Sequence, residues 1–392
     1  MQRRSFLKKF FLDSSIPFIF QSLPSSYLIA NDSSAGVQKD DERLLFDGLD
    51  KLSKRQNSDG SFGSATELFG GDPAVAALCG LAFLGSGSAP GRGRYAVEIS
   101  RIIDFILSCS IKPLAKTSEP YAPPHTSSAL KAYLTRNHIT LSEISGLIAN
   151  VQTRGEKTLY GQGYSILFLS EAYSAFPRED IFTTIKNAVE LIIRTQNTAG
   201  GWRYLPQPAL LADISVSTCM LSALRAAANV GVSIPSEVIS RAQDYILTLQ
   251  NDDGGFRYTA QQGASGYSRT AAAIHALQVT GLLHSPELER ALDYLERQIL
   301  SKEDASLPIN QPSYWAYGQF YTALVLWRLK TDRQRQNIWN VFFERYKREV
   351  IERRSSSTGL WESSASKEAE SALILCAFEI PLERTPFFLA PT

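Results

Sequence analysis

Gln196-Asn-Thr-Ala-Gly-Gly-Trp-Arg-Tyr204 is repeated further along the chain as Gln250-Asn-Asp-Asp-Gly-Gly-Phe-Arg-Tyr258. A weaker copy, Gln56-Asn-Ser-Asp-Gly-Ser-Phe62, keeps the spacing from glutamine to aromatic, and Gly359-Leu-Trp361 keeps only the end of the pattern. Each of the three longer copies follows an amphipathic run with helical periodicity. Copies of one pattern at the ends of such runs predict a repeat protein made of stacked helical units.

Each part of this repeated motif has a physical role in a helix-ending turn. The glycine pair can take the positive φ that stops a helix. The glutamine can satisfy open carbonyls or turn amides of a neighbouring copy, because helix ends leave such groups without partners. The aromatic residue, Trp202 or Phe256, is expected to be a plug that is buried against the next helix pair.

The motif resembles the glutamine–tryptophan repeat of the squalene–hopene cyclase and prenyltransferase superfamily. The resemblance covers roughly residues 42–380, and the chain is most similar to exported bacterial cyclase-like repeat proteins. It implies an all-α fold, an α/α toroid in which helical hairpins circle a central cavity.

The chain between these limits alternates two kinds of predicted helix. Amphipathic helices with charges on one face should form an outer ring; they are Arg43–Gln56, Arg94–Cys109, Arg178–Gln196, Pro235–Gln250, Pro286–Leu300 and Arg333–Ile351. Helices that are nearly free of charge and rich in small residues should form an inner ring; they are Asp72–Leu84, Gly161–Tyr173, Asp213–Val230, Ser268–Gly281, Tyr314–Leu329 and Glu368–Ile380. Six hairpins close a circle, and the polar starts of the inner helices should meet at one end.

An insertion at residues 110–158 interrupts this alternation. Lys112–Pro124 is rich in proline and lysine, and two short helices are predicted at Thr126–Tyr133 and Leu141–Val151. The insertion is interpreted as lying over one mouth of the toroid. It is either a lid or surface decoration. Residues 381–392 form a C-terminal tail.

The N-terminus carries the pattern Arg3-Arg4-Ser-Phe6-Leu7-Lys8, which matches the twin-arginine export signal. The apolar stretch Phe10–Ala30 is broken by Asp13 and two prolines, so it is a poor membrane span. We therefore expect a signal peptide at residues 1–35, a tether at 36–41, and export in folded form by the twin-arginine translocation machinery to the periplasm or another extracytoplasmic compartment. The alternative is a basic N-terminus without a targeting role.

Composition excludes several classes of partner. Forty basic and 39 acidic residues leave a net charge of +1, so neither nucleic acid nor a polybasic membrane contact is indicated. The four cysteines lie singly inside apolar runs, without metal-ligand spacing, and are expected to be small buried hydrophobic residues. No cofactor and no metal are predicted.

The resemblance also shows which chemistry is missing. Hopene cyclases protonate their substrate with the middle acid of an Asp-x-Asp-Asp motif, and the matching stretch here is Asp213-Ile214-Ser215-Val216. Only Asp213 remains, and a serine hydroxyl is far too weak an acid to protonate an alkene. The zinc ligands of protein prenyltransferases are missing too, because 259–270 holds neither Asp nor Cys and His275 stands alone as an expected structural residue.

Candidate ligand contacts come from the starts of the inner helices. They are Asp72, Gln162, Tyr164, Asp213, Arg269, Trp315, Tyr317, Tyr321 and Glu370. Acids at helix starts are also typical caps, and aromatics at helical spacing are also typical core residues, so both readings stay open. Asp213 is the candidate catalytic residue if the protein is an enzyme.

Three functions follow from these observations. The first is binding of a small apolar or glycan-like ligand in the central cavity. The second is an isoprenoid-modifying or glycan-modifying enzyme that uses Asp213 and the carboxylates of the rim. The third is a scaffold for other proteins of the cell envelope.

Overall fold

A computed structural model describes residues 39–63, 71–112, 132, 134–136, 138–140, 142–150, 158–301, 314–330, 332, 335–362 and 366–383. Six α-helices of this part form an inner ring: α3 (Pro73–Gly85), α6 (Thr158–Ala175), α8 (Ile214–Asn229), α10 (Tyr267–Val279), α12 (Trp315–Leu329) and α14 (Lys367–Glu379). Six others lie outside it: α2 (Lys39–Ser53), α4 (Ala96–Ser108), α7 (Glu179–Thr195), α9 (Ser236–Leu247), α11 (Pro286–Leu300) and α13 (Gln336–Glu352). The short 3₁₀ helix η3 (Ile380–Leu382) follows α14.

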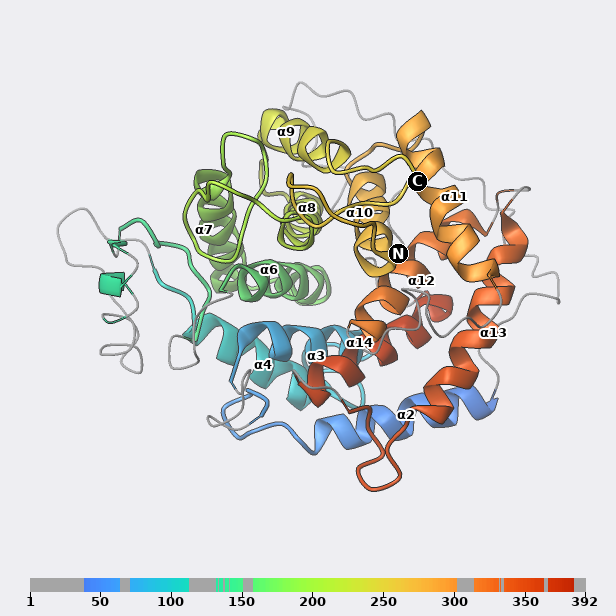
Figure 1. The fold of residues 1–392 in the computed structure, drawn as a ribbon. Helices are drawn as coiled ribbons and strands as arrows, with labels where there is room; N and C mark the ends of the chain where they lie inside the picture. Colours follow the sequence, from blue (N-terminus) through green and yellow to red (C-terminus); the bar gives the residue numbers. More distant parts are fainter. Residues whose placement is uncertain are drawn as a thin grey trace, which may run out of the picture. The chain divides into compact units, whose positions relative to one another are not determined.

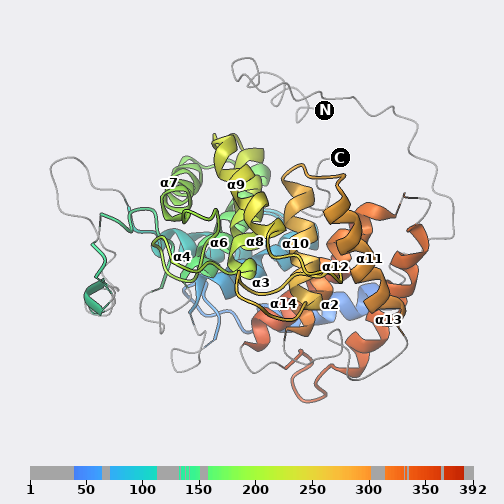
Figure 2. The ribbon, with the colours of Figure 1, turned by 45° about the horizontal axis from the view of Figure 1, so that its top comes forward.

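The inner helices close a circle. Each packs against the next along the chain, from α3 through α6, α8, α10 and α12 to α14, and α14 packs back against α3. The outer helices surround them, so that α2 at the beginning lies beside α14 near the end (Figures 1 and 2). The predicted α/α toroid of six helical hairpins is confirmed, and the predicted helix bounds differ from the observed ones by a few residues at most.

The two rings differ in how their residues are buried. Every residue of α3 except Ala74 is buried, as expected for a helix with apolar neighbours on all sides. The outer helix α11 buries one stripe that includes Leu288, Leu292 and Leu295, and its charged residues face solvent. The charge pattern in the sequence therefore identified the two rings correctly.

Small residues let the inner helices approach each other. A Cβ on Gly80 of α3 would lie 2.4 Å from the Phe168 ring of α6, and one on Gly163 of α6 would lie 2.5 Å from Sγ of Cys219 on α8. Both distances are impossible contacts, so these positions require glycine. The close packing of the inner ring depends on them.

The starts of neighbouring inner helices meet at one end of the ring. Oγ of Ser268, in the first turn of α10, donates to the carbonyl of Tyr314, the N-cap of α12, at 3.2 Å. A Cβ on Gly161, near the start of α6, would lie 3.7 Å from Oδ1 of Asp72, the N-cap of α3. Neighbouring inner helices are thus parallel, and we call this end of the ring the mouth.

The glutamines of the repeated motif all make the same pair of bonds. Nε2 of Gln196 donates to the carbonyls of Gly200 in its own turn, at 2.8 Å, and of Val238 in the following outer helix, at 2.9 Å. Gln250 and Gln56 each donate in the same way to their own turn and to the first turn of the next outer helix. The predicted bridging role of the glutamine is confirmed, and it ties each turn to the next unit.

The two glycines of the motif have different structural roles. Gly200 has a φ of 97°, and a Cβ there would lie 2.1 Å from the carbonyl oxygen of Arg241. Gly201 has ordinary backbone angles, but its Cβ would overlap Ala212 and Tyr245. The first glycine therefore supplies the positive φ, and the second permits close packing.

The aromatic of the motif is the buried plug that was expected. Trp202 is completely buried, and its Nε1 donates to the carbonyl of Ile192 at 2.8 Å. Its backbone N–H donates to Oγ of Ser217 on the inner helix α8, at 3.0 Å. Trp361 is buried and bonded in the same manner at the end of the chain.

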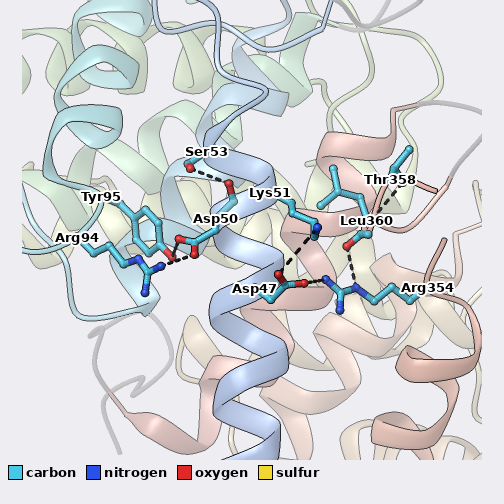
Figure 3. A network of polar contacts seen from close by, with 10 residues as sticks. Asp47, Asp50, Lys51, Ser53, Arg94, Tyr95, Arg354, Thr358 and Leu360 are labelled. Carbon is cyan, nitrogen blue, oxygen red and sulfur yellow. Dashed lines mark hydrogen bonds and ion pairs between the residues drawn. The ribbon is translucent and has the colours of Figure 1, made fainter. Parts of the chain in front are cut away.

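Helix α2 joins the two ends of the ring through its acidic residues (Figure 3). Asp50 binds Arg94 and accepts a hydrogen bond from the hydroxyl of Tyr95 at 2.9 Å. Asp47 binds Arg354, whose Nε donates to a carbonyl of the last repeat turn at 2.7 Å. In this turn Arg354 takes over the role that glutamine has in the other turns.

The insertion differs from its prediction. The expected helix Leu141–Val151 is wrong, because residues 142–150 form turns and Ile148 pairs with Ser110 in an antiparallel bridge. Gly146 has a φ of 88°, and its Cβ would lie 2.1 Å from a backbone oxygen of α7. The segment is therefore a repeat turn with a diverged sequence, packed against an outer helix. Of the expected helix Thr126–Tyr133, only Ala132 lies within the described residues.

Other expectations concern the ends of the chain and its cysteines. All four cysteines are free and buried, as predicted. No helix in the described part is long and apolar enough to span a membrane. The predicted signal peptide, the first half of the tether and most of the C-terminal tail lie outside the described residues, and the second half of the tether belongs to α2.

Candidate ligand site at the mouth of the inner ring

Asp213 is a buried acid at the start of the inner helix α8. Its Oδ1 accepts the backbone N–H of Val216 at 2.9 Å, which makes it the N-cap of the helix. Its Oδ2 is buried without an ordinary hydrogen bond. Burial raises the pKa of Asp213 to about 6, although the Val216 N–H and the charge of Arg203 oppose this rise. The carboxyl group is thus capable of exchanging a proton near neutral pH.

Tyrosines from several elements gather around this carboxyl group. Tyr204 and Tyr258, the last residues of the two best repeats, join their hydroxyls in a hydrogen bond. Their backbone carbonyls accept the N–H groups of Leu159 and Ile214 at 3.0 Å each, so each repeat turn is fixed on the start of the preceding inner helix. Electrostatic repulsion by Asp213 helps burial to raise the pKa of Tyr258.

The inner helices α6 and α12 add further tyrosines. The rings of Tyr317 and Tyr321 lie 4.7 Å apart on α12. Tyr160 and Tyr164 face them from α6, and burial, together with neighbouring tyrosines, raises the pKa of both. We call Tyr160, Tyr164, Tyr204, Tyr258, Tyr317 and Tyr321 the tyrosine cluster.

Two features of Tyr317 point to a site and not only to a core. Among the described residues neither its hydroxyl nor Oδ2 of Asp213 makes a hydrogen bond of ordinary geometry, although Thr218 and Ser215 lie close enough to the hydroxyl, and Tyr258 to Asp213, to lower the pKa of each group. Burial raises the pKa of Tyr317, and Asp213 contributes to the rise. Its side chain is nevertheless half-buried and keeps access to solvent, as does that of Tyr160. Both atoms are buried, and Asp213 is buried completely, while the side chains of Tyr160 and Tyr317 beside them are partly exposed.

Two more acids of the mouth have a raised pKa. Asp72 caps α3 by accepting the N–H of Ala74 at 2.8 Å, and burial raises its pKa to about 6. Burial raises the pKa of Glu370 to about 7, against the opposing influence of the Ala316 N–H and of Arg353. Both acids are half-buried. The mouth therefore holds three carboxyl groups that are partly protonated near neutral pH.

Three of the predicted contacts have structural partners instead. Gln162 is completely buried, and its amide bonds to the backbone of Gly146, Ile148 and Ala188 within 3.0 Å. Arg269 donates to two carbonyls of the loop that precedes α10. Trp315 is buried and donates to Oε2 of Glu349 at 2.8 Å. We leave these three residues out of the proposed site.

Tyr204 and Tyr258 are not among the site residues predicted from the sequence. The signal was present, because both repeats end in Arg-Tyr after the aromatic plug.

His275 and the described acids and cysteines show no metal site. No group of three His, Cys, Asp or Glu residues within the described ranges could hold a metal ion. His275 is completely buried, and burial, together with Arg328, lowers its pKa well below the usual value.

The fold and the repeat turns agree with one protein family. Residues 78–306 and 198–380 match the model of the prenyltransferase alpha-alpha toroid domain. The chain belongs to this family. No curated protein matches the sequence significantly. The family is thus established for most of the chain.

Solved structures with a similar fold include carbohydrate-active enzymes. An α-1,6-mannanase variant from Salegentibacter sp. HEL1_6, in complex with α-1,6-mannotriose, is 10% identical, with a TM-score of 0.57 over 87% of this chain and 99% of that chain. An unsaturated glucuronyl hydrolase from Bacillus sp. GL1 is 12% identical, with a TM-score of 0.57 over 88% and 97% of the two chains. At these identities the likeness shows the fold alone.

Proposed function

We propose that the toroid binds a small neutral ligand at its mouth, with the tyrosine cluster as the contact surface. The supporting observation is that Oδ2 of Asp213 and the hydroxyl of Tyr317 are both buried without a hydrogen bond of ordinary geometry in the described part of the chain, and that the charge of Asp213 influences the pKa of Tyr317. Such groups are costly to bury unless something bonds to them. A ligand with an apolar body and one polar group, such as a hydroxyl, would satisfy both.

An apolar ligand fits better than a glycan. A sugar needs many directional hydrogen bonds, but the hydroxyls of Tyr204 and Tyr258 already bond to each other, and Gln162 and Arg269 bond to backbone. Aromatic rings offer apolar area to an isoprenoid chain. The glycan remains the alternative, because half-buried acids such as Glu370 also lie at the mouth.

Thermal melts with farnesol and with α-1,6-mannotriose test this proposal. A ligand at one hundred times its dissociation constant should stabilise the protein by about 2.7 kcal/mol. Tyr317→Phe keeps the ring but removes the hydroxyl, and should weaken binding up to about tenfold. Tyr245→Phe is the matched control, because its hydroxyl is also buried without a partner but belongs to the outer helix α9. Equal weakening by both variants would contradict the proposal.

A catalytic role for Asp213 is the second candidate. A carboxyl group with a pKa of about 6 can act as a general acid or base near neutral pH. The substrate would be an isoprenoid or a glycan at the same site. Mass analysis of farnesol and mannotriose after incubation tests it: a product formed by the wild type and absent with Asp213→Asn supports catalysis, and unchanged compounds oppose it.

We also propose that the protein acts outside the cytoplasm. The support is the twin-arginine pattern at Arg3 and Arg4, followed by Phe6 and Leu7. Buried free cysteines agree with export of a folded chain, because no disulfide has to form after transport.

A further inference from the structure

The inner ring has a second polar feature at the end opposite the mouth. Arg328 lies in the last turn of α12, eleven residues after Tyr317, which corresponds to about 16 Å along the helix. Its Nη1 lies 3.0 Å from Nδ1 of His275 on α10. Because arginine can only donate, Nδ1 is the acceptor, and the proton of the neutral imidazole is on Nε2. The imidazole thus fixes one edge of the guanidinium.

The other edge of this guanidinium has no partner. Nε and Nη2 of Arg328 are both buried without a hydrogen bond in the described part of the chain. These two groups donate in parallel from one edge of the planar guanidinium, which is the arrangement that holds both oxygens of a carboxylate or phosphate. A preorganised fork of donors is therefore available.

Within the described residues no carboxylate forms an ion pair with Arg328. Burial alone lowers its pKa to about 10, so it remains charged at neutral pH, and no acid opposes this shift. The neighbouring Lys330, in contrast, pairs with Glu383 at 2.7 Å. The C-terminal end of α12 favours a positive charge but supplies no acceptor to the fork. A buried charge without a counter-ion is costly, and an anion from outside the chain would remove that cost.

We propose that Nε and Nη2 of Arg328 bind a small oxyanion, a carboxylate or a phosphate group, at the end of the inner ring opposite the mouth. This site is separate from the tyrosine cluster. Arg328 is about 16 Å along α12 from Tyr317, and Tyr321, the cluster member on α12 nearest to it in sequence, is almost completely buried with its ring 5.3 Å from that of His275. The proposal therefore does not depend on the function proposed for the mouth.

Thermal melts of the full chain at constant ionic strength test this site. Inorganic phosphate and acetate are titrated separately, with chloride as the reference anion. We expect a saturable rise in Tm with at least one of the two, and their order of affinity distinguishes a phosphate ligand from a carboxylate. Arg328→Met should abolish the rise in Tm. When neither anion is added, this variant should be at least as stable as the wild type. Arg328→Lys should weaken binding at least tenfold, because an ammonium group lacks the fork.

Two further variants make the outcome decisive. Arg225→Met removes another inner-helix arginine whose Nε is buried without a hydrogen bond in the described residues and whose guanidinium makes none to a histidine there, and this variant should keep the full response. Asp213→Asn should keep it as well, so failure of the mouth proposal would not affect this one. The absence of a saturable rise with both anions, or an equal rise in Arg328→Met, would overturn the proposal.

Discussion

At the scale of single residues, Asp213 combines a structural and a chemical role. As the N-cap it bonds through one oxygen, and the other oxygen is buried without a hydrogen bond of ordinary geometry among the described residues. The cap alone would work equally well with a fully ionised acid. The raised pKa is thus a property of the mouth and not of the helix start.

The first prediction uses this raised pKa. The ordinary pKa of 3.8 rises to about 6 on folding, so the neutral acid stabilises the fold fully below about pH 4, and this contribution is lost as pH rises through 6. Asp213→Asn keeps the cap and cannot ionise. Relative to the wild type, the variant should gain about 3 kcal/mol between pH 4 and pH 7.5, at about 1.4 kcal/mol for each pKa unit. Urea unfolding of both proteins at the two pH values measures this difference in the free energy of unfolding. A difference that does not change with pH would contradict a raised pKa.

The second prediction concerns the aromatic plug. Trp202→Ala should lower the free energy of unfolding by about 3–5 kcal/mol, because a large buried ring is removed. Phe176→Ala is the control, since Phe176 is 47% exposed and its loss should cost far less. Denaturant unfolding compares the two. A cost below about 1 kcal/mol at Trp202 would mean that the turn does not need its plug.

At the scale of elements, the third prediction tests how one unit is tied to the next. Gln196→Ala removes the two hydrogen bonds that the side chain donates to carbonyls of its own turn and of α9. The variant should lower the free energy of unfolding by about 1–3 kcal/mol. Gln262→Ala, at an exposed position, is the control. Hydrogen exchange should show that backbone amides lose protection first in the turn after α7 and in α9. Uniform loss over all helices would indicate that the ring unfolds only as a whole.

At the scale of the whole molecule, the fourth prediction concerns export. Replacing Arg3 and Arg4 by lysine should keep the protein in the cytoplasm of a bacterial host, whereas Lys8→Arg with Lys9→Arg should not. Cell fractionation distinguishes the two, and unchanged export of the double-lysine variant would sink the proposal. A reductant should leave the Tm unchanged, because all four cysteines are free.

The sequence by itself determined the repeat, the two rings and most helix bounds. These features depend on local patterns, such as the charge-free run of α3 and the glutamine-to-aromatic spacing at Gln196 and Trp202. It also identified Asp213 and Tyr317 as candidates, because both fall near starts of inner helices. Local periodicity carries that information, since parallel inner helices must bring their starts to one end.

Only the tertiary structure decided which of the candidates remain available to a ligand. Gln162 and Arg269 are bound to backbone groups that are near them only in the folded ring, so their polarity is already used. The turn at Gly146 has no recognisable motif, because its glutamine is supplied from another helix. The free fork of Arg328 was likewise invisible in the sequence. Whether a polar group has a partner depends on neighbours that are distant along the chain, and only the closed ring brings those neighbours together.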